Sequence, residues 1–356
     1  MSGITWGRVG CRQSELMALV CSNGVRGLHV SRYRLGVMVD STLFNVQTES
    51  DLVDEVAVDA DADDPGLASV VAWFRAQKDM EKRFGLILRQ SMDEVLDGQR
   101  TGRFDVETLE KTEKTYLGTK VEIVIRAMFE LPRGNKMDYR VAGHDVDSKF
   151  SLRGSWSIPT EAMGHLCLLT SASDLASTFD VGIIRITPEV LNSGRNKDQK
   201  TTISKNGRNR IIWLVRSARL PENLLLSLPR STVSRILSAG SGQKKINALL
   251  LHAQCHVIDR NTAVTVAQQH DGLKRCRDAR PVLAKDGIVV LGHQNDSPVV
   301  ARALELPKLE KGTFLSVRLV SVADSSGGRP VVNIDGQLYA VAREDEPVEP
   351  APRIRY

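Results

Sequence analysis

The chain has 356 residues and a mass of 39.2 kDa, a length that suggests two domains. Hydrophobic residues make up 42% and charged residues 26%, close to the globular average, which excludes wholesale disorder and a fibrous repeat. The net charge of +5 is unevenly spread, since residues 49–64 hold eight acids and no bases, whereas residues 190–300 hold 18 Lys and Arg against 7 Asp and Glu. Such a basic half indicates nucleic-acid binding, with a plain soluble basic surface as the alternative.

Several protein classes are excluded by missing motifs. No apolar run approaches the roughly 18 residues that cross a bilayer, and the run at residues 16–21 is too short for a signal peptide. The five cysteines are scattered and form no C-x-x-C, which argues against a zinc ribbon or a disulfide scaffold, and no P-loop motif is present. We therefore expect a cytoplasmic protein that does not bind membranes and is not a P-loop ATPase.

The first third of the chain changes from irregular to helical. Residues 1–65 show no sustained period and end in an acidic run, which predicts a poorly ordered extension and linker with, at most, a weak hairpin at 28–39. Residues 67–96 have apolar side chains at helical spacing, and Asp97-Gly98 predicts the stop, with Gly98 at positive φ. Asp105 is the expected N-cap of a second helical region that ends near residue 131, with a possible break at Gly118.

After residue 134 the apolar period changes from helical to alternating. Residues 137–141 and 146–152 are predicted strands, joined by a hairpin turn at 142–145. Further strands are expected at 165–170, 181–186 and 210–216. A helix, a hairpin and more strands predict an α/β fold with a mixed sheet.

Candidate catalytic residues are concentrated in this hairpin. Asp138 lies on its first strand, and the second strand carries Asp147-Ser148-Lys149, whose first and third side chains share a face. Two carboxylates beside a lysine suit Mg²⁺, and the lysine can orient or help deprotonate an attacking water. The alternative is a solvated hairpin with ordinary surface charges.

The spacing Asp138-x8-Asp147-x-Lys149 matches the D-x(n)-[DE]-x-K signature of Mg²⁺-dependent nucleases. Glu122 is a further candidate, because it lies among apolar residues of the preceding helix, where a carboxylate is unfavourable unless it is paired or near a metal. His144 and Asp145 are interpreted as turn residues. The predicted metal ligands are thus Glu122, Asp138 and Asp147.

Residues 192–210 form a segment that is nearly free of apolar side chains and rich in groups that reach phosphates and base edges. A disordered basic loop is the alternative, although it would lie between two strands of the predicted sheet. The candidate DNA-binding residues here are Arg195, Lys197, Lys200, Lys205, Arg208 and Arg210.

The second half has the element order of a winged helix-turn-helix. After a helix at 243–254, residues 259–267 are the expected first helix, 268–270 the turn and 271–280 the recognition helix, capped by Asp271. Residues 283–293 are the expected strand and turn of the wing, and an ordinary helical domain is the alternative. The bases expected to face outward to DNA are Lys274, Arg275, Arg277 and Arg280.

Three segments resemble the NaeI family of type II restriction endonucleases: TLEKTEKT at 108–115, MDYRVAGHDVDSKF at 137–150 and DGLKRCRDAR at 271–280. The resemblance covers roughly residues 67–320. It implies a restriction-endonuclease-like PD-(D/E)xK domain with Glu122, Asp138, Asp147 and Lys149 as its active site, followed by a winged-helix domain. It also implies a Mg²⁺-dependent homodimer that binds two copies of a palindrome similar to GCCGGC, one cleaved and one bound as effector.

The expected organisation is an extension at 1–65, a catalytic domain at 66–217, an effector domain at 218–330 and a C-terminal hairpin and tail at 331–356. Three functions remain open at this point. A type II restriction endonuclease is favoured; a repair-type nicking or mismatch endonuclease and a winged-helix regulator without enzymatic activity are the alternatives. The intact set of Asp138, Asp147 and Lys149 argues against the regulator.

Overall fold

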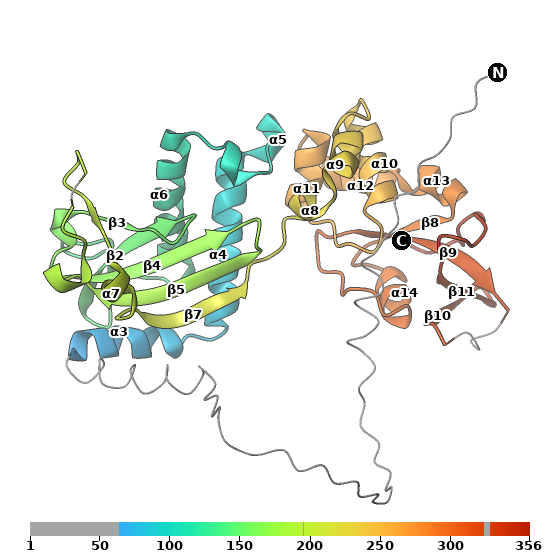
Figure 1. Cartoon of the computed structure of the whole chain (residues 1–356). Helices are drawn as coiled ribbons and strands as arrows, with labels where there is room; N and C mark the ends of the chain where they lie inside the picture. Colours follow the sequence, from blue (N-terminus) through green and yellow to red (C-terminus); the bar gives the residue numbers. More distant parts are fainter. Residues whose placement is uncertain (1–63, 195, 324–327) are drawn as a thin grey trace, which may run out of the picture. The chain divides into compact units, whose positions relative to one another are not determined.

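The computed structural model describes residues 64–194, 196–323 and 328–356 (Figure 1). The possible hairpin at 28–39, nearly all of the expected extension and Arg195 lie outside the described residues. The described part begins at Asp64, whose side chain accepts a hydrogen bond from the Leu67 N–H and caps α3 (Pro65–Arg75). The expected boundary at residue 65 therefore falls inside a helix.

The helix predicted over 67–96 is two helices, because the chain turns between α3 and α4 (Met80–Leu96), where Asp79 takes a positive φ of 52°. The stop after residue 96 is confirmed, but Asp97 takes the left-handed conformation at φ 46°, and Gly98 opens the short helix α5 (Gly98–Thr101). Spacing of apolar residues locates the helical region but does not reveal a one-turn interruption.

The second helical region starts later than expected. Asp105 caps the 3-10 turn η1 (Val106–Thr108) by accepting a hydrogen bond from the Glu107 N–H, and α6 (Lys111–Met128) follows. Helix α6 runs through Gly118 without a break. None of the described helices is both long and apolar enough to span a bilayer.

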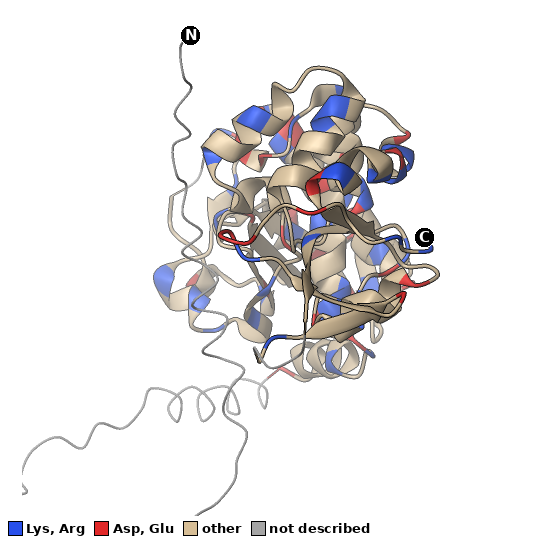
Figure 2. Cartoon of the chain, turned by 90° about the vertical axis from the view of Figure 1, so that its right-hand side faces the viewer, with Lys and Arg blue, Asp and Glu red and all other residues tan. Residues whose placement is uncertain are grey.

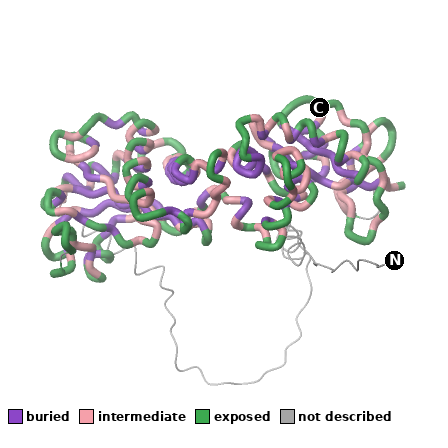
Figure 3. The backbone as a smooth tube through the Cα atoms, turned by 90° about the horizontal axis from the view of Figure 1, so that it is seen from above, coloured by how far each residue is buried: buried purple, intermediate pink, exposed green. Residues whose placement is uncertain are grey.

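The predicted mixed sheet is confirmed. Its five strands have the order β1-β2-β4-β5-β7, with β2 and β4 parallel and the other pairs antiparallel. Figure 3 shows much of its backbone as buried. The strands are β1 (Tyr139–Val141), β2 (His144–Ser151), β4 (Leu166–Ser173), β5 (Thr178–Arg185) and β7 (Ile212–Arg219).

The two faces of this sheet are covered differently. Helices α3, α4 and α6 pack on one face, as Figure 1 shows, with fully buried Phe74, Phe84 and Leu168 in the shared core. The opposite face carries a smaller core that includes Cys167, Leu169 and Trp156. Three short elements contribute to this second core: β3 (Ser157–Ile158), η2 (Thr160–Ala162) and η3 (Pro188–Val190). Strand β6 (Thr201–Thr202) pairs with β3, and α7 (Lys205–Arg208) packs against η3.

The C-terminal part combines a helical cluster with a second sheet. This sheet is antiparallel, with the order β10-β11-β9-β8, so the hairpin β10–β11 extends it rather than forming a separate unit. The helices are α8 (Leu224–Ser227), α9 (Arg230–Leu237), α10 (Gly242–His252), α11 (Arg260–Ala267), α12 (Gly272–Asp278), α13 (Arg280–Leu283), η4 (Ala284–Asp286) and α14 (Ser297–Ala303). The strands are β8 (Ile288–Leu291), β9 (Leu315–Val322), β10 (Val331–Ile334) and β11 (Gln337–Val341).

The predicted helix–turn–helix order has a counterpart in α11 and α12. Asp259 caps α11 by accepting the Thr262 N–H at 2.7 Å, and Gln268 leaves the helix with φ 51°. Asp271 precedes α12, but its side chain pairs with Arg275 instead of capping the helix. The strand expected within residues 283–293 is present as β8, but the turn after it does not lead directly to the antiparallel partner β9, because α14 lies between the two strands.

Candidate active site

The hairpin that carries the candidate residues has a tighter turn than expected. Only Ala142 and Gly143 connect β1 to β2, with φ of 47° and 85°, the positive pair that a two-residue type I′ turn requires. His144 and Asp145 consequently lie in β2, and their assignment to the turn is wrong. Alanine seldom takes positive φ, so the sequence held no clear signal for this turn.

The loop before the first strand is held in place from the second strand. The Asp145 carboxylate accepts hydrogen bonds from the backbone N–H groups of Asn135 and Lys136, at 3.0 and 2.8 Å. These bonds lower the pKa of Asp145. Asp145 therefore holds in place the loop backbone that leads to Asp138.

Gly134 allows this loop to close tightly. A Cβ atom at this position would lie 2.4 Å from the Met137 carbonyl oxygen and 2.7 Å from that of Tyr139. Only glycine fits such an approach without moving the backbone. This close packing fixes the backbone at Asp138, which lies between Met137 and Tyr139 in the sequence.

The structure brings Asp138, Asp147 and Lys149 together. The Ser148 N–H donates to Asp138 Oδ2 at 2.7 Å, and Lys149 Nζ lies 2.6 Å from Asp147 Oδ2. Asp147 is 7% exposed. Burial, together with the neighbouring Asp147 charge, raises the pKa of Asp138, although the Ser148 N–H opposes the shift. Asp138 and Asp147 are thus neighbouring acids in a poorly solvated environment beside Lys149.

Glu122 approaches this group from α6 without joining it. Its carboxylate pairs with Arg126 at 3.7 Å, one helical turn away, and its backbone carbonyl accepts a hydrogen bond from the buried Tyr139 hydroxyl at 2.9 Å. Burial is the main cause that raises the pKa of Glu122, followed by the charge of Asp138. Glu122 is therefore an electrostatic neighbour of Asp138 rather than its direct partner.

The carboxylates of the candidate residues are possible ligands of a divalent cation. In the described residues no group of three or more His, Cys, Asp or Glu side chains is close enough together to hold a metal ion. The pair Asp138 and Asp147 nevertheless fits Mg²⁺, which takes one or two carboxylates and completes its shell with water and phosphate. Burial is the main cause that raises the pKa of Asp138, followed among the raising causes by the charge of Asp147, so a cation bound beside the two acids would favour their ionised forms.

Sequence reasoning missed two features next to these residues. Cys167 on β4 is fully buried, and its thiol donates to Asp147 Oδ2 at 3.3 Å. A hollow of about 590 Å³ follows the end of β2, and its lining includes Lys111, Lys114 and Arg153. Two of these bases were present in the quoted segment 108–115, but their position near β2 depends on how α6 packs.

The basic segment is folded against the sheet face of the candidate residues. Asp147 and Lys149 are in register with Cys167 and Leu169, which belong to the smaller core. Ile203 of the basic segment packs in the same core, so the alternative of a disordered loop is wrong for its described residues. The bases remain exposed around this anchor: Lys197, Lys200, Lys205, Arg208 and Arg210.

The bases of the expected recognition helix have unequal surroundings. Lys274 and Arg277 are exposed, whereas Arg275 pairs with Asp271 at 2.9 Å. Arg280 does not face outward as expected: its guanidinium stacks on the Tyr356 ring at 3.8 Å, and its Nε donates to a backbone carbonyl in β8. Figure 2 shows Lys and Arg distributed over the helices of the C-terminal part.

Comparison with known proteins identifies the class of protein to which this chain belongs. The sequence profile described as "Restriction endonuclease NaeI" matches residues 68–350. The enzyme is accordingly a type II site-specific deoxyribonuclease that acts on DNA. This family match supports neither of the two alternatives, a repair-type nuclease and a regulator without enzymatic activity.

The chain belongs to the NaeI family of restriction endonucleases. It is 39% identical over 277 residues to the type II restriction enzyme NaeI of Lentzea aerocolonigenes, an alignment that covers 75% of this chain and 87% of that protein. The restriction-endonuclease interpretation of the sequence is confirmed, and both the hairpin β1–β2 and the helices α11 and α12 lie within the matched range.

Proposed function

We propose that Asp138, Asp147 and Lys149 form the active site and that the enzyme hydrolyses both DNA strands in a Mg²⁺-dependent reaction. One observation carries the proposal. A buried acid, Asp147, and a half-buried acid, Asp138, lie beside a lysine at a sheet face whose covering layer presents a run of exposed bases. Acids of this kind repel DNA unless a cation joins them, and the surrounding bases attract it.

Each residue has a distinct role in this proposal. Asp138 and Asp147 would hold the cation, which would neutralise phosphate charge and make a bound water more acidic. Lys149 is tethered between Asp147 Oδ2 and the Ser148 carbonyl, at 2.6 and 3.1 Å, and presents its ammonium group to the phosphate. From there Lys149 aligns the attacking water and neutralises charge that develops on the phosphate. Glu122 acts from the outer shell by fixing water near Asp138.

DNA is held on both sides of these residues. The bases of 192–210 lie over the same sheet face, and the hollow beyond β2 adds Lys111, Lys114 and Arg153. In the protein alone Glu107 binds Arg153 at 3.2 Å and Lys114 at 3.5 Å, which keeps both bases in place until phosphate arrives. This arrangement gives a backbone contact on each side of the cut bond.

The C-terminal part is proposed to be the effector domain, spanning residues 218–356 and following a catalytic domain at 66–217. It binds a second copy of the recognition site through exposed bases such as Lys274 and Arg277 on α12, in the manner of a winged-helix protein. The proposal extends the domain past residue 330, because β10 and β11 belong to the sheet of β8 and β9.

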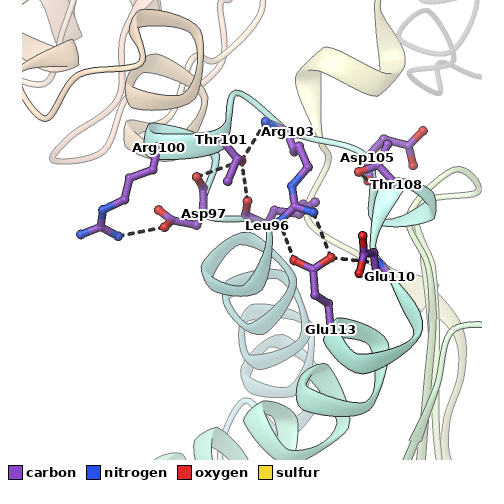
Figure 4. Close-up of polar contacts among 9 residues, drawn as sticks. All are labelled: Leu96, Asp97, Arg100, Thr101, Arg103, Asp105, Thr108, Glu110 and Glu113. Carbon is purple, nitrogen blue, oxygen red and sulfur yellow. Dashed lines mark hydrogen bonds and ion pairs between the residues drawn. The ribbon is translucent and has the colours of Figure 1, made fainter.

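A direct contact between α5 and α11 supports coupling of the two domains. A Cβ at Gly98 would lie 2.2 Å from Thr265 Oγ1, so these helices touch without intervening side chains. Figure 4 follows the chain from α5 to Arg103, which binds both carboxylate oxygens of Glu113 at the start of α6. Helix α6 carries Glu122, and DNA on the effector domain stimulates cleavage if it favours the active arrangement of this chain of contacts.

The preferred DNA is proposed to be a GC-rich palindrome similar to GCCGGC, on the basis of the relationship to NaeI. A palindrome presents the same chemistry twice, related by a two-fold axis. Cutting both strands of it is accomplished most simply by a symmetric homodimer that offers one active site to each strand.

Alanine substitution of Asp138, Asp147 or Lys149 tests the assignment of the site. Each variant should lose cleavage while keeping specific DNA binding in Ca²⁺, because the exposed bases that supply affinity are unchanged. Lys136→Ala, next to the site but outside it, is the matched control and should cleave normally. Full activity in any of the three variants contradicts the assignment.

A further inference from the structure

The buried cysteine beside the acid pair has a different setting from another buried cysteine of the chain. Cys167 and Cys276 are both fully buried, but Cys276 packs among apolar side chains of the helical cluster. Cys167 lies directly opposite Asp147 in the parallel pairing of β2 and β4. Its thiol is 3.3 Å from Asp147 Oδ2, so it makes a polar contact that a simple space-filling role does not require.

Two donors from different strands converge on one oxygen of Asp147. Lys149 Nζ reaches Oδ2 from β2 at 2.6 Å, and Cys167 Sγ reaches it from β4 at 3.3 Å. A single donor fixes a distance, whereas two donors on one atom also fix the rotation of the carboxylate. Oδ1 of Asp147 is then available to face a cation. In the same way, the hydrogen bond from the Ser148 N–H to Asp138 Oδ2 leaves Asp138 Oδ1 available.

The two donors differ in how long they can stay. Lys149 has a long flexible side chain that is 22% exposed, so its ammonium group can shift as it engages the phosphate. Cys167 has one rotatable bond before its sulfur and is held in β4, where every residue except the last is buried. When Lys149 moves, the thiol is the donor that keeps Asp147 oriented.

We propose that Cys167 is a positioning residue of the nuclease site: its thiol holds Asp147 Oδ2 and thereby presents Oδ1 to the divalent cation. This inference rests on the proposed metal site and adds a residue to it. Donors that orient metal ligands commonly contribute about 10-fold to metal affinity or more.

The experiment compares Mn²⁺ binding by the full chain without DNA, measured by electron paramagnetic resonance, in wild type, Asp147→Ala and four cysteine variants. Cys167→Ala removes the donor, Cys167→Val also fills the space, and Cys167→Ser restores a donor. Cys276→Ala is the matched control for loss of a buried thiol. Thermal unfolding verifies the fold, and Mg²⁺ titrations of plasmid cleavage run in parallel.

We expect Cys167→Ala and Cys167→Val to weaken Mn²⁺ binding about 10-fold and to raise the Mg²⁺ needed for half-maximal cleavage by a similar factor. Cys167→Ser should recover most of the affinity, and Cys276→Ala should bind as wild type does. If Cys167→Ala destabilises the fold, Cys167→Val still reports the missing donor.

Two results overturn the inference alone: wild-type Mn²⁺ affinity in the variants without a donor, or Cys167→Ser binding no better than Cys167→Val. A different result overturns the proposed metal site and the inference together. That result is wild-type protein that binds no Mn²⁺, or binding that Asp147→Ala leaves unchanged.

Discussion

Neutralising Asp138 should make the metal-free protein more stable while it destroys the enzyme. Burial and Asp147 both raise the pKa of Asp138, so the ionised carboxylate is unfavourable in the fold at neutral and alkaline pH. In Asp138→Asn the amide oxygen can still accept the Ser148 N–H, and the repulsion between the acids disappears. The substitution should therefore raise the free energy of unfolding.

The size of the gain follows from opposing charges. Two like charges about 4 Å apart repel by about 4 kcal/mol at an effective dielectric constant near 20. The ion pair between Lys149 and Asp147 already compensates much of this repulsion. We expect a net stabilisation of about 1–2 kcal/mol from Asp138→Asn.

Chemical denaturation with and without Mg²⁺ is the assay. Mg²⁺ at about ten times its dissociation constant stabilises wild type by about 1.4 kcal/mol, and Asp138→Asn should lose this response. Asp180→Asn is the control, since Asp180 lies in the same sheet but is bonded by the Ser171 hydroxyl and the Ser217 N–H. A destabilised Asp138→Asn protein, or one that Mg²⁺ still stabilises, refutes the reasoning.

Three further outcomes are expected. Gly134→Ala should reduce the cleavage rate by about 100-fold, because the added Cβ shifts the loop that leads to Asp138. Metal binding is measured separately, and an unchanged cleavage rate refutes this prediction. Burial raises the pKa of Asp93 to about 7, so folded protein binds this proton more tightly than unfolded protein. The free energy of unfolding should then fall on the order of 2 kcal/mol between pH 5 and pH 8, and Asp93→Asn should remove that fall in denaturation curves. Lys274→Ala should lower the salt dependence of DNA binding by about one unit, whereas Arg280→Ala should lower the melting temperature instead; the reverse result contradicts the outward and inward placements.

The elements with a strong period were predictable from the sequence. The alternation after residue 134 located the strands of the mixed sheet, and the spacing of Asp138, Asp147 and Lys149 identified the side chains that the fold brings together. These features depend on local geometry, where neighbours in sequence are also neighbours in space.

Features that depend on distant chain segments could not be predicted. Arg280 was expected to face solvent because helical spacing contains no information on Tyr356, which lies far along the chain and covers it. Cys167 looked like any core residue until the register of β2 and β4 placed it beside Asp147. The segment 192–210 looked unanchored because only two of its described residues are buried, Ile203 and Gly207.

Glu122 illustrates a partial prediction. Its apolar neighbours indicated an acid on a helix turned toward the sheet, and burial raises the pKa of Glu122. Arg126, four residues further along the same helix, pairs with the Glu122 carboxylate at 3.7 Å, a contact that the i, i+4 spacing in the sequence could have indicated. The role of Glu122 as a metal ligand stays a prediction.

The most direct test of the account is end sequencing of a mixed-sequence plasmid after incubation with the purified enzyme and Mg²⁺. The account predicts that both strands are cut at one palindromic sequence, that all new ends are the same, and that Lys149→Ala produces none of them. Nicks in one strand, ends at unrelated sequences, or equal cutting by Lys149→Ala would contradict it.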